Sequence, residues 1–600
     1  MAKKEQEMYE GMLVIEASDS KGLEKKLAKL ESRPEKYVVK ISNRSTKIKA
    51  CAFVDCVDIA AVIISDSVTE IEPSAFSRCT GLNNIIMGNS VTEIGGGAFR
   101  GCTGLTSIGI GNSVTKIESC AFEGCTGLTN VVIPDSVKFV VYNIFSGCTS
   151  LTNIVVSEGN KVYDSRNNCN AIIETATNEL IFGCGNTVIP DSVTKIGWHA
   201  FSGCGLKSII IPESVTEIED GAFQGCKDLS NVTISDSVTV IGGHAFEDCK
   251  ALTNIIFGNS VTEFGESAFK GCSSLTNIII PKSVTKIGNH SFHYCMGLTD
   301  IVFPNSVSEI DFDAFNSCTG LTSIVIPDSV TKIGDDAFYG CSGLKSIIVS
   351  DGNKTYDSRN NCNAIIETAT NKLIKGCDST IIPDSVTEIG DYAFYNCAAL
   401  RDIVIPGLVT AIGRNAFQGC TGLTSIVIPD LVTKIQDCAF RDCSGLTNVV
   451  IPDSVEVIED YAFLGCTNLA SVNIPNPAVI IAERAFGDNT ELIVKTEGRL
   501  TLKRYVMGLQ YDYEEFDKEE NDGSYYTTDG TLGELFDNDQ IDAALGEHKK
   551  KYLDEVSDEE IDDIIRDLVL NLDQGAIKSL EIRDGDKTLY EDSNDEPYDD

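Results

Sequence analysis

Cysteine and histidine are the side chains through which this 600-residue sequence, with 23 cysteines and 5 histidines, could do metal or redox chemistry. Zinc needs three or four such ligands that converge, as in paired Cys-x2-Cys motifs. Sixteen of the cysteines instead recur at a nearly constant spacing of 23 residues, from Cys56 to Cys466. A thiol packs in a core as a small apolar group. This spacing therefore predicts buried core positions and no metal site.

The histidines offer a second set of candidate ligands. His199, His244 and His290 share one position, directly before an Ala-Phe pair or its Ser-Phe variant. They fall in alternate 23-residue segments, about 10 Å apart if neighbouring segments stack like strands. That distance is too large for the three histidines to bind one cation at about 2 Å. The pair His290 and His293 has no third ligand near it in the sequence. We predict solvated histidines.

Catalytic motifs give no better candidates. The sequence contains no G-x-S-x-G elbow, no phosphate-binding G-x-x-x-x-G-K-[ST] loop and no H-E-x-x-H pair. We predict a non-enzymatic protein without catalytic, cofactor-binding or metal-binding residues.

The elements that position these residues follow from one repeated unit, clear in LTSIVIPDSVTKIGDDAFYGCSG from Leu321 to Gly343. Its Ala-Phe pair, with two variants, recurs seventeen times. Leu321, Ile324 and Ile326 have the spacing of side chains that point inward from a short strand. A second extended piece follows at 330–333, and 337–341 is expected to form one helical turn. Such units bury their apolar faces only by stacking on one another.

A 20–29-residue period with an L-x-x-I-x-I core is typical of leucine-rich repeats. The unit L-T-x-I-x-I-P-x-S-V-T-x-I-G-x-x-A-F-x-x-C resembles the BspA-like, or treponemal-type, leucine-rich repeats from roughly Ile48 to Lys495. We therefore expect a β-rich leucine-rich-repeat solenoid of about 17 units of 23 residues, with a parallel sheet on its concave face. The resemblance implies a bacterial or protozoan surface protein associated with adhesion to host matrix or to other cells.

The net charge of −41 is concentrated at one end, because 31 acidic and 8 basic residues follow Tyr511. Within this acidic region, Ser557 and Glu560 form a capping box that predicts a helix over 557–572. The expected organisation is an N-terminal segment or cap at 1–45, a solenoid at 46–497 with hairpin inserts near 157–189 and 350–382, a small α/β or helical acidic C-terminal region at 498–590, and a disordered tail at 591–600.

Each insert carries two cysteines. In the first, 170–174 and 179–183 are predicted to be strands joined at Ala176-Thr177, which would place Cys169 opposite Cys184. The same arithmetic places Cys362 opposite Cys377. Facing positions of paired strands are close enough for a disulfide with some adjustment. We expect oxidised pairs if the protein is exported and two small apolar neighbours if it stays in the cytosol.

The outer positions of the longer strand form an uncharged Thr/Asn/Ser band beside an aliphatic stripe. An extended, little-charged face of this kind suits protein contact, although β-branched residues also favour strands for their own sake. The candidate protein-binding face comprises Thr129, Val132, Thr152, Val155, Lys207, Ile210, Thr253, Ile256, Thr276, Ile279, Thr322, Val325, Lys345, Ile348, Arg401, Val404, Thr424 and Val427.

Charge and targeting signals restrict the partners. A strongly acidic chain does not suit nucleic acid, and the sequence has neither an apolar stretch long enough to span a membrane nor a signal peptide. We expect a cytoplasmic scaffold that binds one or more proteins, with no cofactor, no nucleic acid and no membrane insertion. The alternative is a cell-surface adhesin, as the resemblance implies, exported by a route that the sequence does not show.

Overall fold

The computed structural model describes residues 12–487 except 31, 33 and 483, together with the backbone of 493–496, 583–584 and 587–588. The chain divides into two compact units, Met1–Lys503 and Arg504–Asp600. In the second unit, β42 (Arg583–Asp584) pairs antiparallel with β43 (Lys587–Thr588). The predicted helix at 557–572 and the tail at 591–600 lie outside the described residues.

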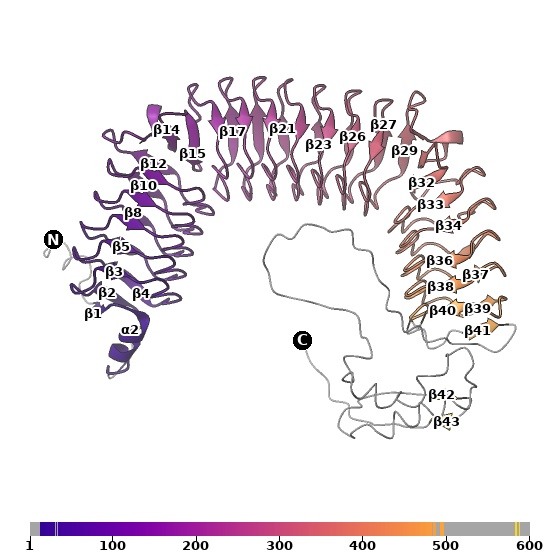
Figure 1. Cartoon of the computed structure of the whole chain (residues 1–600), viewed down its shortest axis with the longest axis horizontal. Coiled ribbons are helices and arrows are strands. Elements are labelled where there is room, and N and C mark those ends of the chain that lie inside the picture. The colour runs from indigo at the N-terminus through magenta and orange to yellow at the C-terminus, as the bar shows by residue number, and fades with distance from the viewer. Residues whose placement is uncertain are drawn as a thin grey trace, which may run out of the picture. The chain divides into compact units, whose positions relative to one another are not determined.

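The first unit is a β-solenoid of about 20 turns, in which most coils contribute a longer strand (Figure 1). Neighbouring longer strands run parallel, and equivalent residues pair across coils, as Ser323 does with Ser346. Inward Ile and Val alternate with more exposed residues along most of these strands, as in Ser323–Ile326, in line with a period of two. The longer strands are β4 (Ile59–Ile63), β6 (Asn84–Ile86), β8 (Ser107–Gly109), β10 (Asn130–Ile133), β12 (Asn153–Val156), β17 (Ser208–Ile211), β19 (Asn231–Ile234), β21 (Asn254–Ile256), β23 (Asn277–Ile279), β25 (Asp300–Val302), β27 (Ser323–Ile326), β29 (Ser346–Val349), β35 (Ser425–Val427), β37 (Asn448–Val450), β39 (Ser471–Ile474) and β41 (Ile493–Thr496).

A second, two-residue strand follows the turn after the longer strand and also pairs in parallel with its neighbours, as Lys286 does with Glu309. Its apolar residue faces the core, and the residue before it is mostly Lys or Glu. These shorter strands are β3 (Lys47–Ile48), β5 (Glu70–Ile71), β7 (Glu93–Ile94), β9 (Lys116–Ile117), β11 (Phe139–Val140), β16 (Lys195–Ile196), β18 (Glu217–Ile218), β20 (Val240–Ile241), β22 (Glu263–Phe264), β24 (Lys286–Ile287), β26 (Glu309–Ile310), β28 (Lys332–Ile333), β33 (Glu388–Ile389), β34 (Ala411–Ile412), β36 (Lys434–Ile435), β38 (Val457–Ile458) and β40 (Ile480–Ile481).

The Ala-Phe segment is a wide turn, which corrects the prediction of a helical turn. Left-handed residues interrupt it, such as Asp313 with φ of 55° and Ser317 with φ of 59°. Its amides bond to the next coil, as in Phe315 N to Ala337 O at 2.8 Å. A helix would have turned these donors inward along its own axis. The turn therefore joins coils as the strands do.

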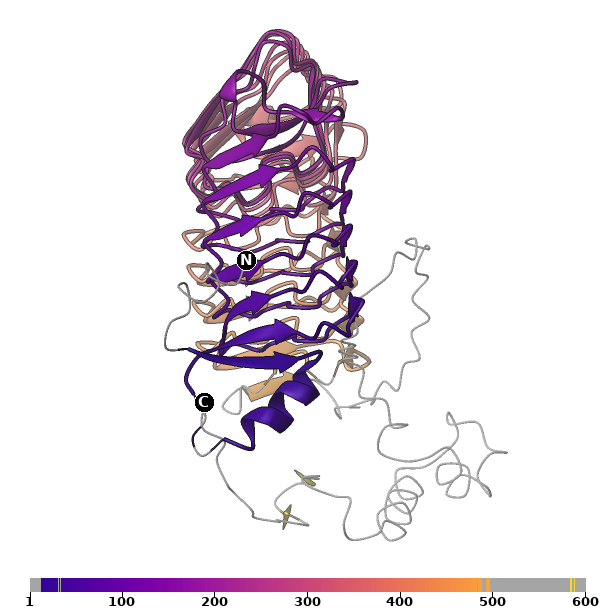
Figure 2. The same cartoon turned by 90° about the vertical axis from the view of Figure 1, so that its left-hand side faces the viewer.

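The N-terminal segment extends the same stack. Strands β1 (Leu13–Ala17) and β2 (Tyr37–Ile41) pair in parallel and continue through β2 into β4. The helix α2 (Ser20–Leu27) begins at Asp19, whose side chain accepts a hydrogen bond from Gly22 N. Leu23 and Leu27 are buried, and Figure 2 shows α2 at the end of the stack of strands. The helix thereby covers apolar surface at this end.

The two inserts repeat one arrangement. Each comprises a short strand, a 3-10 turn and an antiparallel hairpin whose second strand joins the sheet of shorter strands. The predicted strands at 170–174 and 179–183 are confirmed to within one residue. The elements are β13 (Tyr163–Asp164), η1 (Arg166–Asn168), β14 (Ala171–Glu174) and β15 (Glu179–Gly183) in the first insert, and β30 (Tyr356–Asp357), η2 (Arg359–Asn361), β31 (Ile365–Glu367) and β32 (Lys372–Lys375) in the second.

The core runs along the inside of the coils as rows of identical side chains. Phenylalanine rings of successive coils stack with centroids 5.1 Å apart for Phe292 and Phe315 and 5.5 Å apart for Phe315 and Phe338. The core falls into three large clusters whose boundaries lie at the two inserts, and the stacked row of rings is interrupted at the same places.

Candidate binding surface

All eighteen residues of the predicted binding face are exposed. The most continuous part lies on β21 to β29, where Ile256, Ile279, Val302, Val325 and Ile348 occupy the same position in five successive coils, with exposed fractions of 46–83%. We call the exposed aliphatic residues at this position the aliphatic row. Its members are Val132, Val155, Ile210, Ile256, Ile279, Val302, Val325, Ile348, Val404, Val427 and Val450.

Threonine hydroxyls beside the aliphatic row are already hydrogen bonded. Thr253 Oγ1 donates to Ser230 O at 3.2 Å, and Thr322 Oγ1 donates to Thr299 O at 3.1 Å, in each case one coil back. The hydroxyl proton is therefore used within the protein, and the side chain offers an acceptor oxygen and a methyl group. The band is less polar than its composition indicates.

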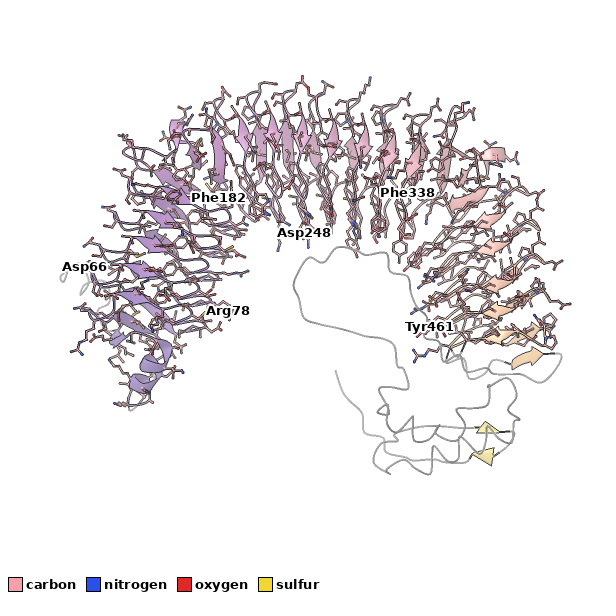
Figure 3. All side chains as sticks on the ribbon, viewed as in Figure 1. Asp66, Arg78, Phe182, Asp248, Phe338 and Tyr461 are labelled. Atoms are coloured by element: carbon pink, nitrogen blue, oxygen red, sulfur yellow. The ribbon has the colours of Figure 1, made fainter. Side chains whose placement is uncertain are left out.

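The sheet of longer strands lies on a flank of the solenoid, which differs from the expected concave position. Arg78, Asp248 and Tyr461 of the Ala-Phe turns lie on the inner side of the first unit's bend, and Asp66, which follows a longer strand, lies on its outer side (Figure 3). Each longer strand therefore runs from the inner side of the bend toward its outer side. Stacked rings, such as Phe292 and Phe315 with centroids 5.1 Å apart, join successive coils at the Ala-Phe turns, whereas the ladder of longer strands is broken, for example between β21 and β23.

The repeated cysteines are confirmed as core residues. Cys79 to Cys466 of the regular series are buried, and the thiol of Cys318 donates to Phe292 O at 3.1 Å. Burial raises the pKa of the Cys295 thiol to about 12, and it raises the pKa of the Cys341 thiol to about 12 as well. Because the thiolate is the metal ligand and the nucleophile, these side chains are poorly suited to either role.

The predicted facing of the insert cysteines is wrong in register. A bulge between Ile172 and Ile173 makes Ala171 pair with Gly183, so Cys184 comes opposite Asn170 rather than Cys169. The Cys184 thiol donates to Asn170 O at 3.3 Å. Cys169 and Cys184 also belong to different core clusters.

In the second insert the same shift separates Cys362 from Cys377, and all four insert cysteines are free and buried.

The histidines do not lie in one environment. His244 Nδ1 lies 2.9 Å from Glu247 Oε2, whereas the Nδ1 atoms of His199, His290 and His293 are buried without a hydrogen-bond partner among the described residues. Burial lowers the pKa of His293, and a neighbouring Asp313 carboxylate opposes this effect. His290, His293 and Asp313 bring their ligand atoms within 4.8 Å of one another. Sequence reasoning missed Asp313 because it lies in the next coil.

Aromatic residues gather where each insert interrupts the coils. The rings of Tyr142 and Trp198 meet edge to face with centroids 5.5 Å apart at the first insert. At the second, the rings of Tyr339 and Tyr395 lie 4.4 Å apart and Tyr392 packs against both. The contacts of Tyr142 with Trp198 and of Tyr339 with the other two tyrosines join residues more than fifty positions apart. They follow from the sequence only once the coils before and after each insert are taken as spatial neighbours.

No deep binding cavity stands out among the described residues. A shallow, open depression lies at the end of β17, lined by Ile210, Pro212 and Thr233. Within the described part of the chain, no helix is both long and apolar enough to cross a bilayer. The extended exposed face therefore remains the main surface feature.

Comparison with known proteins agrees with this architecture. The model of the BspA type leucine rich repeat region matches in six copies, over residues 39–173, 183–299, 285–377 and 366–493. No curated protein matches the sequence.

Among solved structures, a leucine rich cell surface protein from Faecalibacterium prausnitzii is 32% identical, with a TM-score of 0.50, and the match covers 57% of this chain and 94% of that one. A leucine-rich repeat protein from Eubacterium ventriosum is 25% identical, with coverage of 54% and 86% and a TM-score of 0.46. One from Bacteroides ovatus is 26% identical, with coverage of 80% and 92% and a TM-score of 0.29. The family model spans most of the solenoid, and the chain belongs to the BspA type leucine-rich repeat family.

Proposed function

We propose that this chain is a non-enzymatic protein-binding scaffold whose partner lies along the aliphatic row. The observation that supports this most directly is the run of exposed Ile and Val in five successive coils from Ile256 to Ile348. Isolated exposed apolar residues are ordinary on protein surfaces, whereas a contiguous apolar patch marks an interaction site. At about 4.8 Å per coil this run is on the order of 20 Å long.

The chemistry of the face favours a protein partner. Burying one of these side chains contributes about 1–2 kcal/mol, so several must be covered together for useful affinity. The strands between Ile256 and Ile348 carry few charges, and the net charge of −41 repels nucleic acid. Because the row is long and narrow, it best fits an elongated partner surface that presents apolar side chains at a similar spacing.

Affinity capture with a matched pair of variants tests the proposal. The triple variant Ile256→Lys, Ile279→Lys, Val302→Lys puts charge into the aliphatic row at positions that are already exposed, so the fold is retained. The control, Leu408→Lys with Leu431→Lys, charges two exposed apolar residues outside the row. Quantitative mass spectrometry of captured proteins should show at least tenfold loss of specific partners with the triple variant and none with the control.

Retention of every partner by the triple variant would remove the aliphatic row as the binding face. Thermal unfolding of both variants shows that they remain folded, so a loss of capture is attributable to the surface.

A second candidate role is cell-surface adhesion. It is favoured by the likeness to a leucine rich cell surface protein, 32% identical over 94% of that chain. Fractionation and protease treatment of intact cells that make this protein distinguish the two locations. Adhesion requires a pool that external protease digests, and a wholly protected pool rules it out.

A further inference from the structure

Three potential metal ligands meet on the Ala-Phe side of two neighbouring coils. His290 and His293 belong to the turn after β24, and Asp313 occupies in the next coil the position that His290 has in its own. One ligand atom from each of the three lies within 4.8 Å of the others. Stacking thus supplies the third ligand that the linear sequence lacks.

Two of the ligand atoms of this cluster have no hydrogen-bond partner within the described part of the chain. The Nδ1 atoms of His290 and His293 are buried and make no hydrogen bond to any residue that the structure describes. His290 Nδ1 lies 3.4 Å from Asp313 Oδ2 but is not aligned to form a hydrogen bond with it. The equivalent His244 shows the contrast, because its Nδ1 is paired with Glu247. Buried polar atoms without partners are uncommon, and a bound ion is one of the explanations for them.

The carboxylate is held in place from behind. Asn316 Nδ2 donates to Asp313 Oδ1 at 2.8 Å, and both residues are buried. This bond occupies one oxygen and leaves Oδ2 directed at the histidines. A ligating carboxylate is commonly oriented by such an outer hydrogen bond.

We propose that His290, His293 and Asp313 bind a divalent first-row transition metal of the zinc class, which links two neighbouring coils. Two imidazoles and one carboxylate suit Zn²⁺, and Co²⁺ or Ni²⁺ in its place, better than Mg²⁺ or Ca²⁺. Bonds of about 2.0–2.2 Å require donor atoms somewhat closer than 4.8 Å, so small side-chain rotations accompany binding. Three protein ligands leave a fourth position for water or for an acidic group of a partner.

Cobalt titration of the full-length, reduced protein tests this site and distinguishes it from the cysteines. Co²⁺ bound by nitrogen and oxygen gives visible d–d bands, whereas thiolate ligation adds a sulfur-to-metal charge-transfer band in the near ultraviolet. We expect one equivalent of Co²⁺ with the first band and without the second, displaced by Zn²⁺. X-ray absorption of the Zn²⁺ form should show imidazole scattering and no sulfur.

The matched variants come from the protein's own repeats. His290→Asn and Asp313→Asn place there the residue found as Asn415 in a later coil, where it has φ of 53°, and His293→Gln copies Gln418. The fold therefore tolerates each change. Loss of one ligand should weaken Co²⁺ binding by more than about 100-fold, beyond the usual effect of an outer-shell change.

His244→Asn, which alters a histidine already paired with Glu247, should leave Co²⁺ affinity unchanged. Absence of stoichiometric binding by the wild type, a charge-transfer band from sulfur, or equal affinity in the three ligand variants would each overturn the proposal.

Discussion

The two inserts share the same hydrogen bonds between side chains and buried backbone, and they differ in the side chains packed inside them. We call this shared hydrogen-bonded backbone the frame. Asn160 in the first insert donates to Pro134 O and Val137 O, at 2.9 and 3.0 Å. Asn353 in the second donates to the corresponding Pro and Val carbonyls at 2.8 and 2.9 Å. Each asparagine also accepts hydrogen bonds from two backbone amides. The side chains that form hydrogen bonds with the buried backbone are thus the same in both inserts. Loss of either asparagine would leave several backbone donors and acceptors unpaired.

The arginine beside the frame behaves in the same way. Arg166 binds the carboxylate of Asp164 through Nε and Nη2 and reaches Asn178 Oδ1 at 2.8 Å. Arg359 makes the equivalent contacts in the second insert. A planar fork of donors explains why a lysine does not replace either residue.

Behind the frame, the inserts fill the gap in the phenylalanine row differently. Phe182 of the first insert packs edge to face on Phe145, with centroids 5.5 Å apart. The equivalent residue of the second insert is Lys375, which is 3% exposed and whose ammonium has no hydrogen-bond partner among the described residues. Burying an unpaired ammonium is costly.

The surroundings of these two residues differ in charge as well. Asn143 precedes the Phe145 turn, and Asp336 stands at the same position before Phe338. Burial raises the pKa of Asp336 to about 6, with further contributions from Asp313, Asp335 and Asp391, while Lys375 lowers it. The second insert therefore holds a buried cation within the field of several carboxyl groups, whereas the first insert has an uncharged ring at the corresponding position. A frame fixed by hydrogen bonds tolerates a change of interior only where the electrostatics change with it.

The largest effect is expected from moving the lysine to the corresponding position of the first insert, where a phenylalanine stands. Phe182→Lys removes a buried ring and adds an ammonium without the compensating carboxyl groups, which should lower the free energy of unfolding by about 4 kcal/mol or more. Because a solenoid unfolds in parts, hydrogen exchange resolved by segment is the suitable measurement. Exchange should accelerate in β14 and β15 and stay unchanged in β31 and β32.

Phe182→Leu is the matched control for ring loss alone and should cost clearly less. Equal exchange rates in the two variants would show that the charge at this position has no cost of its own.

Removing the charge from the second insert is the reverse experiment, with a smaller effect. Lys375→Met keeps an unbranched chain of similar length and removes the unpaired ammonium, so we expect a gain of about 2 kcal/mol in the free energy of unfolding. Urea unfolding, with exchange at β31 and β32, measures it. Lys354→Met, at an exposed lysine of the same insert, should change little. Destabilisation by Lys375→Met would mean that the attraction of Asp336 outweighs the desolvation of the ammonium.

Much of this architecture could be predicted from the sequence because it depends on local periods. The alternation along the longer strand placed all eighteen face residues in solvent, and the spacing of the cysteines placed them in the core. The hairpin strands of the first insert followed from two short apolar runs around Ala176-Thr177. In each case side-chain direction follows from the strand geometry of a few residues.

Features that depend on how coils meet could not be predicted in this way. The bulge after Ile172 shifts the hairpin by one residue and separates Cys169 from Cys184. The Ala-Phe turn contains left-handed residues such as Asp313, which no helical period indicates. Asp313 also approaches His290 from a neighbouring coil, and the position of the sheet relative to the bend depends on how successive coils stack. These are properties of the stack, which no single unit contains.

The smallest expected effect is a difference between the two inserts in how stability depends on pH. An acid whose pKa is raised in the folded protein binds protons more tightly there than when unfolded, so stability falls as pH rises from about 4 through about 6. Asp336→Asn, which copies Asn143 of the first insert, should remove this fall. At pH 7 the variant should be more stable by about 1 kcal/mol, after allowance for solvent screening of a half-buried carboxyl, and at pH 4 it should equal the wild type.

Unfolding by urea at both pH values measures this change, and Asp351→Asn, at an exposed carboxyl of the same insert, should leave the pH dependence as it is. The change also couples to Lys375. Without the ammonium, the pKa of Asp336 rises further, so Asp336→Asn should gain more at pH 7 in a Lys375→Met background than in the wild type. Equal gains in both backgrounds would show that the two groups do not interact, and the difference between the inserts would then lie in packing alone.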